Sequence, residues 1–425
     1  MKAVNQTLTM VTDERSDSWK RVPIKDIADI NPKLDKSAIP DKLMVSFVPM
    51  QSVGAADGTI DVSNLRSAAE VKKGFTNFQE GDVLFAKITP CMENGKMAVV
   101  PKVASGYGFG STEFHVLRPK DGIDPRYLYY FVSSQSVRKE AAHNMTGAVG
   151  QKRVSTSYIA DLVIPLPPPD QQRLIVAEIE KQFSRVDEAV ANLKRVKANL
   201  KRYKASVLKA AVEGKFVDEQ DGKWQNTTIG DITERVTKGS SPNWQGFQYA
   251  EKGIVFVRSQ NVGWGSLDLS DIAHLPASFN SKEKKSVLKA DDVLLNIVGA
   301  SIGRAAVASK QVEGGNVNQA VAVIRPSKEH LLPKFLLYYL LSDMAQKLIH
   351  SQKVDVARAN YSLDQIKKMP LQLPALEIQR RIVAEIESRF SIVEEMGALA
   401  SSNLTRAENL RQALLKKAFV GQLAH

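Results

Sequence analysis

The sequence predicts an α+β protein with two β-rich domains in tandem, each followed by a long helix, the two helices forming an antiparallel coiled coil. Residues 171–216 return as residues 378–423, with 17 of 46 aligned positions identical and no gap. Both copies place apolar residues at heptad spacing, and short apolar runs separated by glycine and asparagine precede each copy. Repetition at one long period means that fold and function are best analysed for each half separately.

Each copy of the repeat is predicted to form one helix. The first begins QRLIVAEIEKQFSRVDE from Gln172, and the second begins QRRIVAEIESRFSIVEE from Gln379. Prolines precede both predicted helices, and Gly214 and Gly421 come after their last turns, as helix starts and stops require. The shared frame favours packing of the helices on each other over two separate surface helices. The apolar positions of this frame are Phe183, Val186, Val190, Leu193, Leu200, Val207, Ile386, Phe390, Val393, Ala400, Leu404, Ala407 and Leu414.

The non-helical parts repeat as well. Trp19 aligns with Trp224, and strand-like runs such as DVLFAKI and EFHVLRP in the first half correspond to DVLLNIV and AVAVIRP in the second. We expect the prolines at each helix entry to isolate a domain from its helix, with little packing across the junction. The predicted divisions are a tail (1–18), a first domain (19–166), a central helical region (167–216), a second domain (217–373) and a distal helical region (374–425).

The composition favours a polyanionic partner. The net charge is +12 in a chain of 425 residues, and nucleic acid is the usual partner of such a surface. One cysteine, Cys91, excludes a disulfide framework and a cysteine-built zinc site. The N-terminal residues lack the apolar core of a signal peptide, and no apolar run is long enough to span a bilayer. These features predict a cytoplasmic protein without a membrane association.

The sequence lacks the motifs of a DNA-acting enzyme. It has neither a glycine-rich loop with a following helix for an adenosyl cofactor nor an N/D-PP-Y/F motif, and no Walker loop. The run GYGFG from Gly106 is interpreted as turn glycines, because a strand-like run follows it. We therefore expect a non-catalytic protein that holds no cofactor of its own. A stand-alone enzyme acting on DNA and a coiled-coil adaptor that does not bind nucleic acid remain the alternatives.

Reading of DNA requires base-edge donors and acceptors with neighbouring phosphate contacts. Arg, Lys, Gln and Asn gather in loops and at strand ends of both domains, although any one of them is as readily a solvated loop residue. Trp244, Phe247 and Trp264 are expected in the core, with stacking groups as the alternative. The DNA-binding candidates are Lys87, Thr89, Asn94, Lys96, Gln151, Lys152, Arg153, Arg258, Gln260, Asn261, Asn296, Ser301, Arg304, Asn318, Gln319, Arg358 and Asn360.

The order of a β-rich domain, a loop ending in RVSTSYI, the entry LPPPDQQRLIVAEIE and a long helix, followed by the whole set again, resembles the specificity (S) subunit of type I restriction-modification enzymes. The resemblance covers nearly the entire chain, and its most specific motif is the proline entry with its QR-IVAEIE helix, present twice. It implies two target-recognition domains, each of which reads half of a split double-stranded DNA target.

The resemblance also implies partners. Two methyltransferase (M) subunits would dock on the helical regions and two restriction (R) subunits would join outside, so that S-adenosylmethionine, Mg²⁺ and ATP belong to partner chains. The helix residues carried over as subunit-binding candidates are Gln172, Arg173, Glu178, Phe183, Gln379, Arg380, Glu385 and Phe390.

Overall fold

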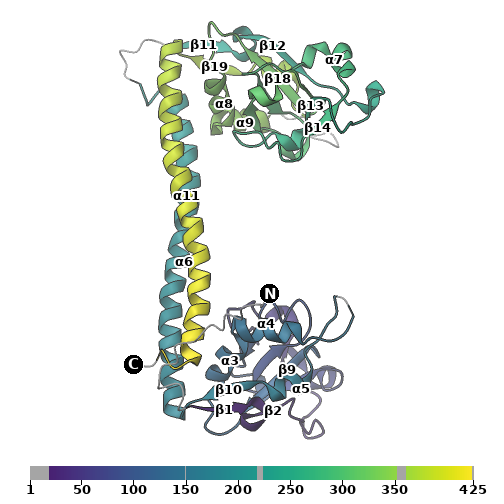
Figure 1. The fold of residues 1–425 in the computed structure, drawn as a ribbon, viewed down its shortest axis with the longest axis vertical. Coiled ribbons are helices and arrows are strands. Elements are labelled where there is room, and N and C mark those ends of the chain that lie inside the picture. The colour runs from purple at the N-terminus through teal and green to yellow at the C-terminus, as the bar shows by residue number, and fades with distance from the viewer. Residues whose placement is uncertain (1–18, 149, 218–223, 352–359, 424–425) are drawn as a thin grey trace, which may run out of the picture. The chain divides into compact units, whose positions relative to one another are not determined.

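The computed structural model describes residues 19–148, 150–217, 224–351 and 360–423, and its contacts divide the chain into two compact units (Figure 1). The first unit is Met1–Leu193 with Ser402–His425, and the second is Lys194–Ser401. Both divisions fall inside the predicted long helices, which are α6 (Pro169–Val212) and α11 (Leu376–Phe419). Each unit therefore contains one β-rich domain together with parts of both helices.

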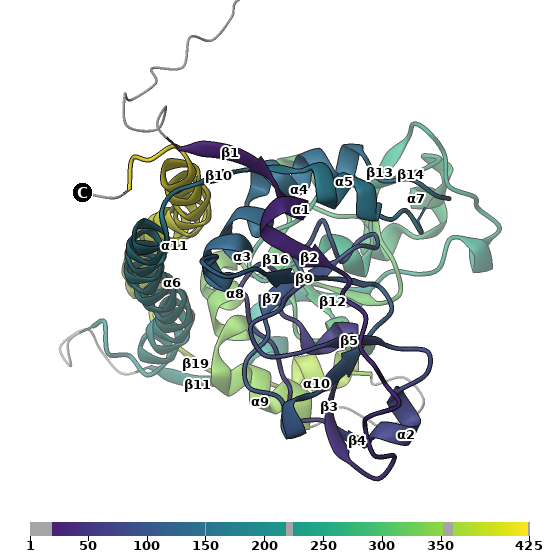
Figure 2. The same cartoon turned by 90° about the horizontal axis from the view of Figure 1, so that it is seen from below.

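Two four-stranded sheets form the centre of the first unit (Figure 2). The order β2-β9-β6-β7 is antiparallel, and the order β4-β3-β8-β5 contains one parallel pair, β3 with β8. The strands are β2 (Ala28–Ile30), β3 (Met44–Val48), β4 (Leu65–Ser67), β5 (Thr76–Phe78), β6 (Val83–Ala86), β7 (Met97–Val99), β8 (Gly108–Gly110) and β9 (Phe114–Pro119). The helices are α1 (Ile24–Ile27), α2 (Ala68–Val71), α3 (Pro125–Ser133), α4 (Gln135–His143) and α5 (Thr156–Asp161).

Strand β6 shows why a continuous apolar run forms a strand here. Successive side chains of a strand point to opposite faces. Val83 and Phe85 pack into the core that α3 covers, whereas Leu84 and Ala86 pack into a separate core on the other face. Because both faces are covered, the run needs no polar alternation.

The interpretation of GYGFG as turn glycines is wrong for its second half. Gly108–Gly110 forms strand β8, which pairs with β3 and β5. A Cβ on Gly108 would lie 2.1 Å from the Phe78 ring, and one on Gly110 would lie 2.4 Å from the Val48 carbonyl oxygen. Glycine is therefore needed for close packing rather than for a turn.

The second unit repeats this plan. Its main sheet has the antiparallel order β12-β18-β15-β16, and a smaller sheet has the order β14-β13-β17. The strands are β12 (Thr233–Lys238), β13 (Ile254–Val257), β14 (Ala273–Leu275), β15 (Val293–Asn296), β16 (Ala305–Val307), β17 (Asn316–Val317) and β18 (Val321–Pro326). The helices are α7 (Ser278–Lys282), α8 (Pro333–Leu341), α9 (Asp343–Ser351) and α10 (Leu363–Lys367).

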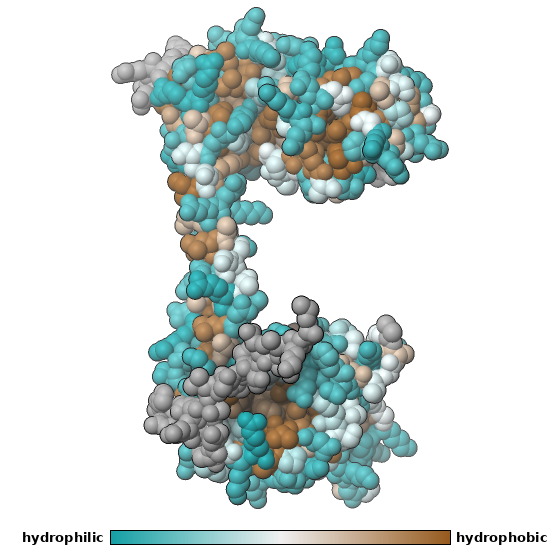
Figure 3. Space-filling view, viewed as in Figure 1, coloured by the Kyte–Doolittle hydropathy of each residue, from teal (hydrophilic) through white to brown (hydrophobic). Residues whose placement is uncertain are grey.

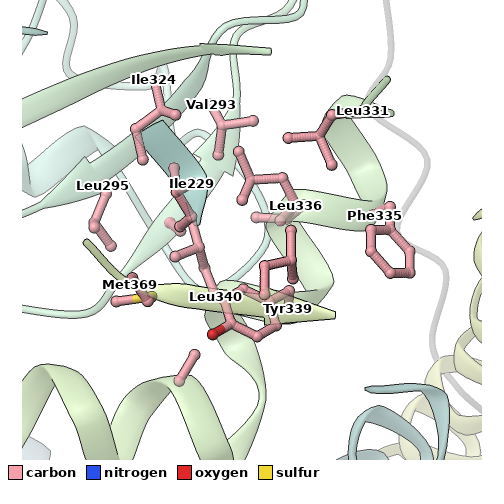
Figure 4. Packing of buried hydrophobic residues seen from close by; sticks show 14 of the residues in the cluster. Ile229, Val293, Leu295, Ile324, Leu331, Phe335, Leu336, Tyr339, Leu340 and Met369 are labelled. Carbon is pink, nitrogen blue, oxygen red and sulfur yellow. The ribbon is translucent and has the colours of Figure 1, made fainter. Parts of the chain in front are cut away.

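Helix α8 covers one face of this main sheet. Leu336 and Leu340 of the helix are fully buried and point toward Val293 and Leu295 of β15 (Figure 4). Proline at the first position of α8 starts the helix, as it does in α3. The strand-like runs predicted in the two halves are confirmed, because they form β6 and β9 in the first unit and β15 and β18 in the second.

Little packing across the domain-helix junction was expected, and this expectation is wrong. In the first unit, Ile175 and Ile179 of α6 and Leu415 and Ala418 of α11 belong to the same buried cluster as α3. One short strand pair in each unit also joins the domain to the start of its helix. These are β1 (Lys20–Pro23) with β10 (Val163–Leu166), and β11 (Gln225–Thr228) with β19 (Pro370–Leu373).

In each unit, part of α6 lies antiparallel to part of α11 (Figure 1). In the first unit the Arg411 guanidinium pairs with Asp187 and lies 4.9 Å from the centroid of the Phe183 ring. Every apolar residue of the predicted heptad frame is buried or half-buried. The second unit has the same trio of a cation, an acid and a phenylalanine at a shift of 207 residues. The Lys204 ammonium lies 3.1 Å from the Glu394 carboxylate and 4.9 Å from the centroid of the Phe390 ring.

Candidate nucleic-acid interface

A loop of the first unit brings together candidates that are far apart in sequence. The Thr89 amide donates to the Lys152 carbonyl oxygen at 3.0 Å, and the Val154 amide donates to that of Lys87 at 2.8 Å. Gln151 and Lys152 are exposed at the outer side of this loop, whereas Lys87 and Thr89 are half-buried. Five predicted residues, Lys87, Thr89, Gln151, Lys152 and Arg153, thus share one loop cluster.

Arg153 holds this loop in place. Its Nε and Nη2 donate to the two carboxylate oxygens of Glu113 at 2.9 and 2.8 Å. The hydrogen bond from Arg153 is the main reason why the pKa of Glu113 is lowered. Because both of these donors are engaged with Glu113, the Arg153 guanidinium holds the loop rather than binding a ligand. The exposed Lys152 is then the cation that the loop presents to solvent.

A buried histidine supports the same loop from below. The His115 Nε2 lies 2.9 Å from the Val154 carbonyl oxygen, and its Nδ1 lies 3.1 Å from the Asn31 amide nitrogen. Both contacts are satisfied by a neutral ring that donates from Nε2 and accepts at Nδ1. Burial lowers the pKa of His115, which keeps the ring neutral.

The turn of residues 90–96 contributes one exposed amide. Asn94 is exposed, but the Lys96 ammonium is half-buried and donates to the carbonyl oxygens of Met50 and Val53 at 3.1 and 2.8 Å. Lys96 is therefore a structural residue in this conformation. Of Asn94 and Lys96, only Asn94 has a side chain available to bind DNA.

In the second unit, three candidates converge on Asp271. Arg258 Nη2 donates to its carbonyl oxygen at 2.7 Å, and Gln260 Nε2 donates to its carboxylate at 2.9 Å. Asn261 is buried, and its amide donates to the carbonyl oxygens of Asp268 and Asp271. The structure thus brings these three residues together, and the hydrogen bonds of their side chains are internal.

The following strands give a second group in this unit. Asn296 is fully buried and donates to the Ser259 carbonyl oxygen at 2.8 Å, so it orders the loop rather than contacting solvent. Ser301 and Arg304 are half-buried, and the Arg304 side chain has no hydrogen bond or ion pair to any described residue. Asn318 and Gln319 are half-buried and Asn360 is exposed, while Arg358 lies outside the described residues.

Two buried ion pairs fix both sheets, and sequence reasoning missed them. Arg118 holds both carboxylate oxygens of Asp82 at 2.8 Å, and Arg325 holds both of Asp292 at 2.7 Å. Each pair links neighbouring strands, β6 to β9 and β15 to β18. The signal was present, because the two arginines align at the same shift of 207 residues and an aspartate directly precedes each partner strand.

The predicted subunit-binding residues divide into two groups. Gln172 is buried, accepts from the Asp124 amide at 2.9 Å and donates to the Pro167 carbonyl oxygen at 3.0 Å. Gln379 does the same with Leu332 and Pro374 at 2.8 and 2.9 Å, so both glutamines join a domain to its helix. The remaining candidates are exposed or half-buried, and they are Arg173, Glu178, Phe183, Arg380, Glu385 and Phe390.

Helix α11 exposes an apolar stripe that the sequence analysis did not single out. Ile392, Met396 and Leu399 are 55, 47 and 62% exposed. Spacings of four and three residues place them on one helix face, which we call the exposed apolar face. Figure 3 shows brown apolar patches along the long helices between teal polar residues. A surface of this kind indicates contact with another chain.

The residues that the structure describes offer no candidate for catalysis by metal. No group of three His, Cys, Asp or Glu side chains lies close enough to hold an ion within those ranges. None of the described helices is both long and apolar enough to cross a membrane. The chain thus has two similar β-rich domains that carry polar loops and are joined by long helices. This arrangement defines a two-domain recognition scaffold.

The comparisons place this scaffold in a family. The chain belongs to the type I restriction modification DNA specificity domains, whose family model matches residues 16–202 and again residues 221–394. It is 38% identical over 177 residues to the Escherichia coli EcoAI specificity subunit, a match that covers 41% of this chain but only 30% of that relative. It is 27% identical over 321 residues to the Escherichia coli EcoBI specificity subunit, covering 72% of this chain and 67% of that one.

A solved structure confirms the architecture. A chain from a study titled as complex assembly and conformational transition of the type I R-M system superimposes with a TM-score of 0.76. The match covers 95% of this chain and 98% of that one at 22% identity, so it supports the fold alone. The family assignment and this likeness confirm the predicted resemblance and the predicted α+β fold.

Proposed function

We propose that this chain is the non-catalytic subunit that recognises a two-part DNA sequence and directs methyltransferase and restriction subunits to it. The observation that carries the proposal is the double match to the DNA specificity family model, once over residues 16–202 and once over residues 221–394. Each match falls largely on one β-rich domain and its helix. Each half of the chain would then read one half of the target.

The side chains available for DNA are those that are not buried and do not fix a loop in place. Direct reading needs exposed donors and acceptors, and buried amides such as those of Asn261 and Asn296 are occupied inside the chain. Without the buried Asn261 and Asn296 and the structural Lys96 and Arg153, the described candidates are Lys87, Thr89, Asn94, Gln151, Lys152, Arg258, Gln260, Ser301, Arg304, Asn318, Gln319 and Asn360.

The exposed apolar face supports a docking site for a methyltransferase subunit. Ile392, Met396 and Leu399 would be covered in such a complex, which would remove their apolar surface from water. In this proposal two methyltransferase and two restriction subunits assemble with the chain in the cytoplasm. S-adenosylmethionine, Mg²⁺ and ATP would be held by those partners, because the sequence offers no cofactor loop.

Methylome sequencing tests the proposal directly. Cells without other DNA methylation would express this chain with its methyltransferase subunit, and we expect one new split methylated sequence. The methyltransferase without this chain, and this chain without the methyltransferase, should each give none. Methylation by this chain alone, or an unsplit target, would contradict the proposal.

The docking site has a separate test. Leu399→Glu should weaken assembly with the methyltransferase subunit, because it introduces a charge into an apolar contact. The matched control is Glu408→Gln on the same helix, which alters an exposed side chain nine residues from Leu399 and hence on the opposite face. Equal assembly of both variants and the wild-type chain would exclude this face as the contact.

A further inference from the structure

The second unit presents one tryptophan almost completely to solvent. Trp244 is 83% exposed, more than any other large apolar side chain among the described residues. The expectation that it lies in the core is therefore wrong, as it is for Trp264, which is 60% exposed. Phe247 is half-buried and contacts the Phe279 ring edge-on at 5.3 Å. Burial of an indole in a contact would remove a large apolar surface from water. An indole that is exposed in the free chain therefore indicates a binding site for a partner.

The turn that carries Trp244 is held firmly. Residues Asn243–Gln245 form a single 3₁₀ turn, closed by Gly246 in the left-handed region at φ 81°. The Lys282 ammonium donates to the Gln245 carbonyl oxygen at 3.0 Å, and Gln245 Nε2 donates to Glu283 at 2.9 Å. Both bonds are made by Gln245, the residue next to Trp244, and they pre-order this turn, which lowers the entropy lost on binding.

The surroundings of this turn are basic. Lys282, Lys284 and Lys285 follow one another with a single intervening acid, and all three are exposed. That acid, Glu283, is buried and already accepts a hydrogen bond from Gln245. The Lys285 carbonyl oxygen accepts from Arg235 of β12 at 3.2 Å, which ties this basic segment to the strand that leads to Trp244.

The first unit has no counterpart of Trp244. After β2 its chain continues Asn31–Pro32–Lys33–Leu34 without any aromatic residue before Phe47. Features that both halves share maintain the common fold. A feature found in one half only can instead contact the part of the target that this half reads. Trp264 lies at the opposite edge of the same sheet, because the neighbouring Gly265 amide donates to Ala305 of β16 at 2.9 Å.

We propose that Trp244 is a DNA contact of the second unit, its indole packing against sugar and base edges while the flanking lysines bind phosphates. This inference rests on the proposed function. A flat apolar ring among cations complements a polymer that alternates anionic phosphates with planar, weakly polar groups. A protein partner would need more apolar surface in this segment than Tyr249, which is 53% exposed, adds to the indole, and the neighbouring lysines favour DNA.

Fluorescence gives the first test, because it needs no knowledge of the target. The full chain assembled with its methyltransferase subunit would be titrated with a random-sequence duplex at low salt. The emission component that Trp244→Phe removes should become protected from acrylamide on binding. The component that Trp264→Phe removes should stay accessible, and this variant is the matched control within the same unit.

Affinity gives the second test, using the duplex target identified by methylome sequencing. Trp244→Ala should weaken binding by roughly tenfold, because the contact would bury part of the apolar surface of the indole. It removes no charge, so the slope of log K against log salt should not change. Lys284→Ala should instead reduce that slope by roughly 0.9. Trp264→Ala should leave both quantities at the wild-type value.

Two results would overturn the inference. One is wild-type DNA affinity in the Trp244→Ala assembly, together with a Trp244 indole that stays accessible to acrylamide when the wild-type assembly binds DNA. The other is a variant that assembles poorly with the methyltransferase subunit yet binds DNA normally, which would make Trp244 a protein contact. A protected Trp244 without any split methylated target would instead count against the proposed function alone.

Discussion

Substitution of Leu415 by alanine should destabilise the β-rich domain at the other end of the sequence. Leu415 lies near the end of α11, is 4% exposed and shares a buried cluster with Tyr127, Leu128 and Phe131 of α3. Removal of a buried leucine side chain typically costs about 2–5 kcal/mol, and the well-packed site favours the middle of that range. A loss of about 3.5 kcal/mol at 1.4 kcal/mol per tenfold predicts roughly three-hundredfold faster exchange of the amides that open with the unit.

Hydrogen exchange followed by mass spectrometry resolves this effect by region. Peptides that contain α3 should lose protection in Leu415→Ala, while peptides that contain α8 should not. The equivalent residue at the 207-residue shift is Leu208, which is 7% exposed in the cluster of the second unit. Leu208→Ala should therefore show the reverse pattern.

The control lies on the same helix. Leu410 is 49% exposed, so Leu410→Ala should change the exchange of either unit by little. If Leu415→Ala deprotected α8 as strongly as α3, or left α3 unchanged, the assignment of the end of α11 to the first core would be wrong.

Three further outcomes are expected. Lys152→Ala should weaken binding to all DNA sequences and reduce the salt slope by about 0.9, whereas Arg153→Ala should mainly loosen its loop, as measured by salt titration and by exchange of residues 146–155. Burial lowers the pKa of His115 below its usual 6.5, so the unfolded chain binds the proton first as the pH drops. The free energy of unfolding should therefore fall as the pH drops through about 6.5. His115→Gln should reduce the change in melting temperature between about pH 7.5 and about pH 5.5. Replacement of residues 19–160 by the equivalent segment of a relative should change one half of the methylated target only, and a change in both halves would refute separate reading.

The structure modifies that last design. Ile175, Ile179 and Leu415 pack into the first core from the two long helices, so a grafted domain must fit them. Sequence reasoning from the prolines missed this packing, because proline marks where a helix begins but says nothing of what the helix then covers. The heptad frame did reveal that the helices pack, since apolar periodicity reports a buried face directly.

The candidate residues show a similar limit. Asn261 and Asn360 have the same chemistry and similar loop settings in the sequence, yet one is buried and fully engaged while the other is exposed. Whether an amide faces solvent depends on tertiary contacts with distant carbonyl groups, which no local pattern records. Lys87 and Lys152 were selected separately because their segments are rich in suitable donors. The pairing of the two segments and the fixing role of Arg153 beside Glu113 became apparent only in the structure.

The matching helix trios have a consequence for assembly. Phe183 and Asp187 lie in the first half of α6, and Lys204, which meets Phe390 and Glu394, lies in its second half. Because Lys204 is the counterpart of Arg411 at the 207-residue shift, a single copy of α6 carries both sides of the contact. A polypeptide with one domain and one such helix would be self-complementary. Two copies would form an isologous dimer, and twofold symmetry would then require its two half-sites to be inverted repeats.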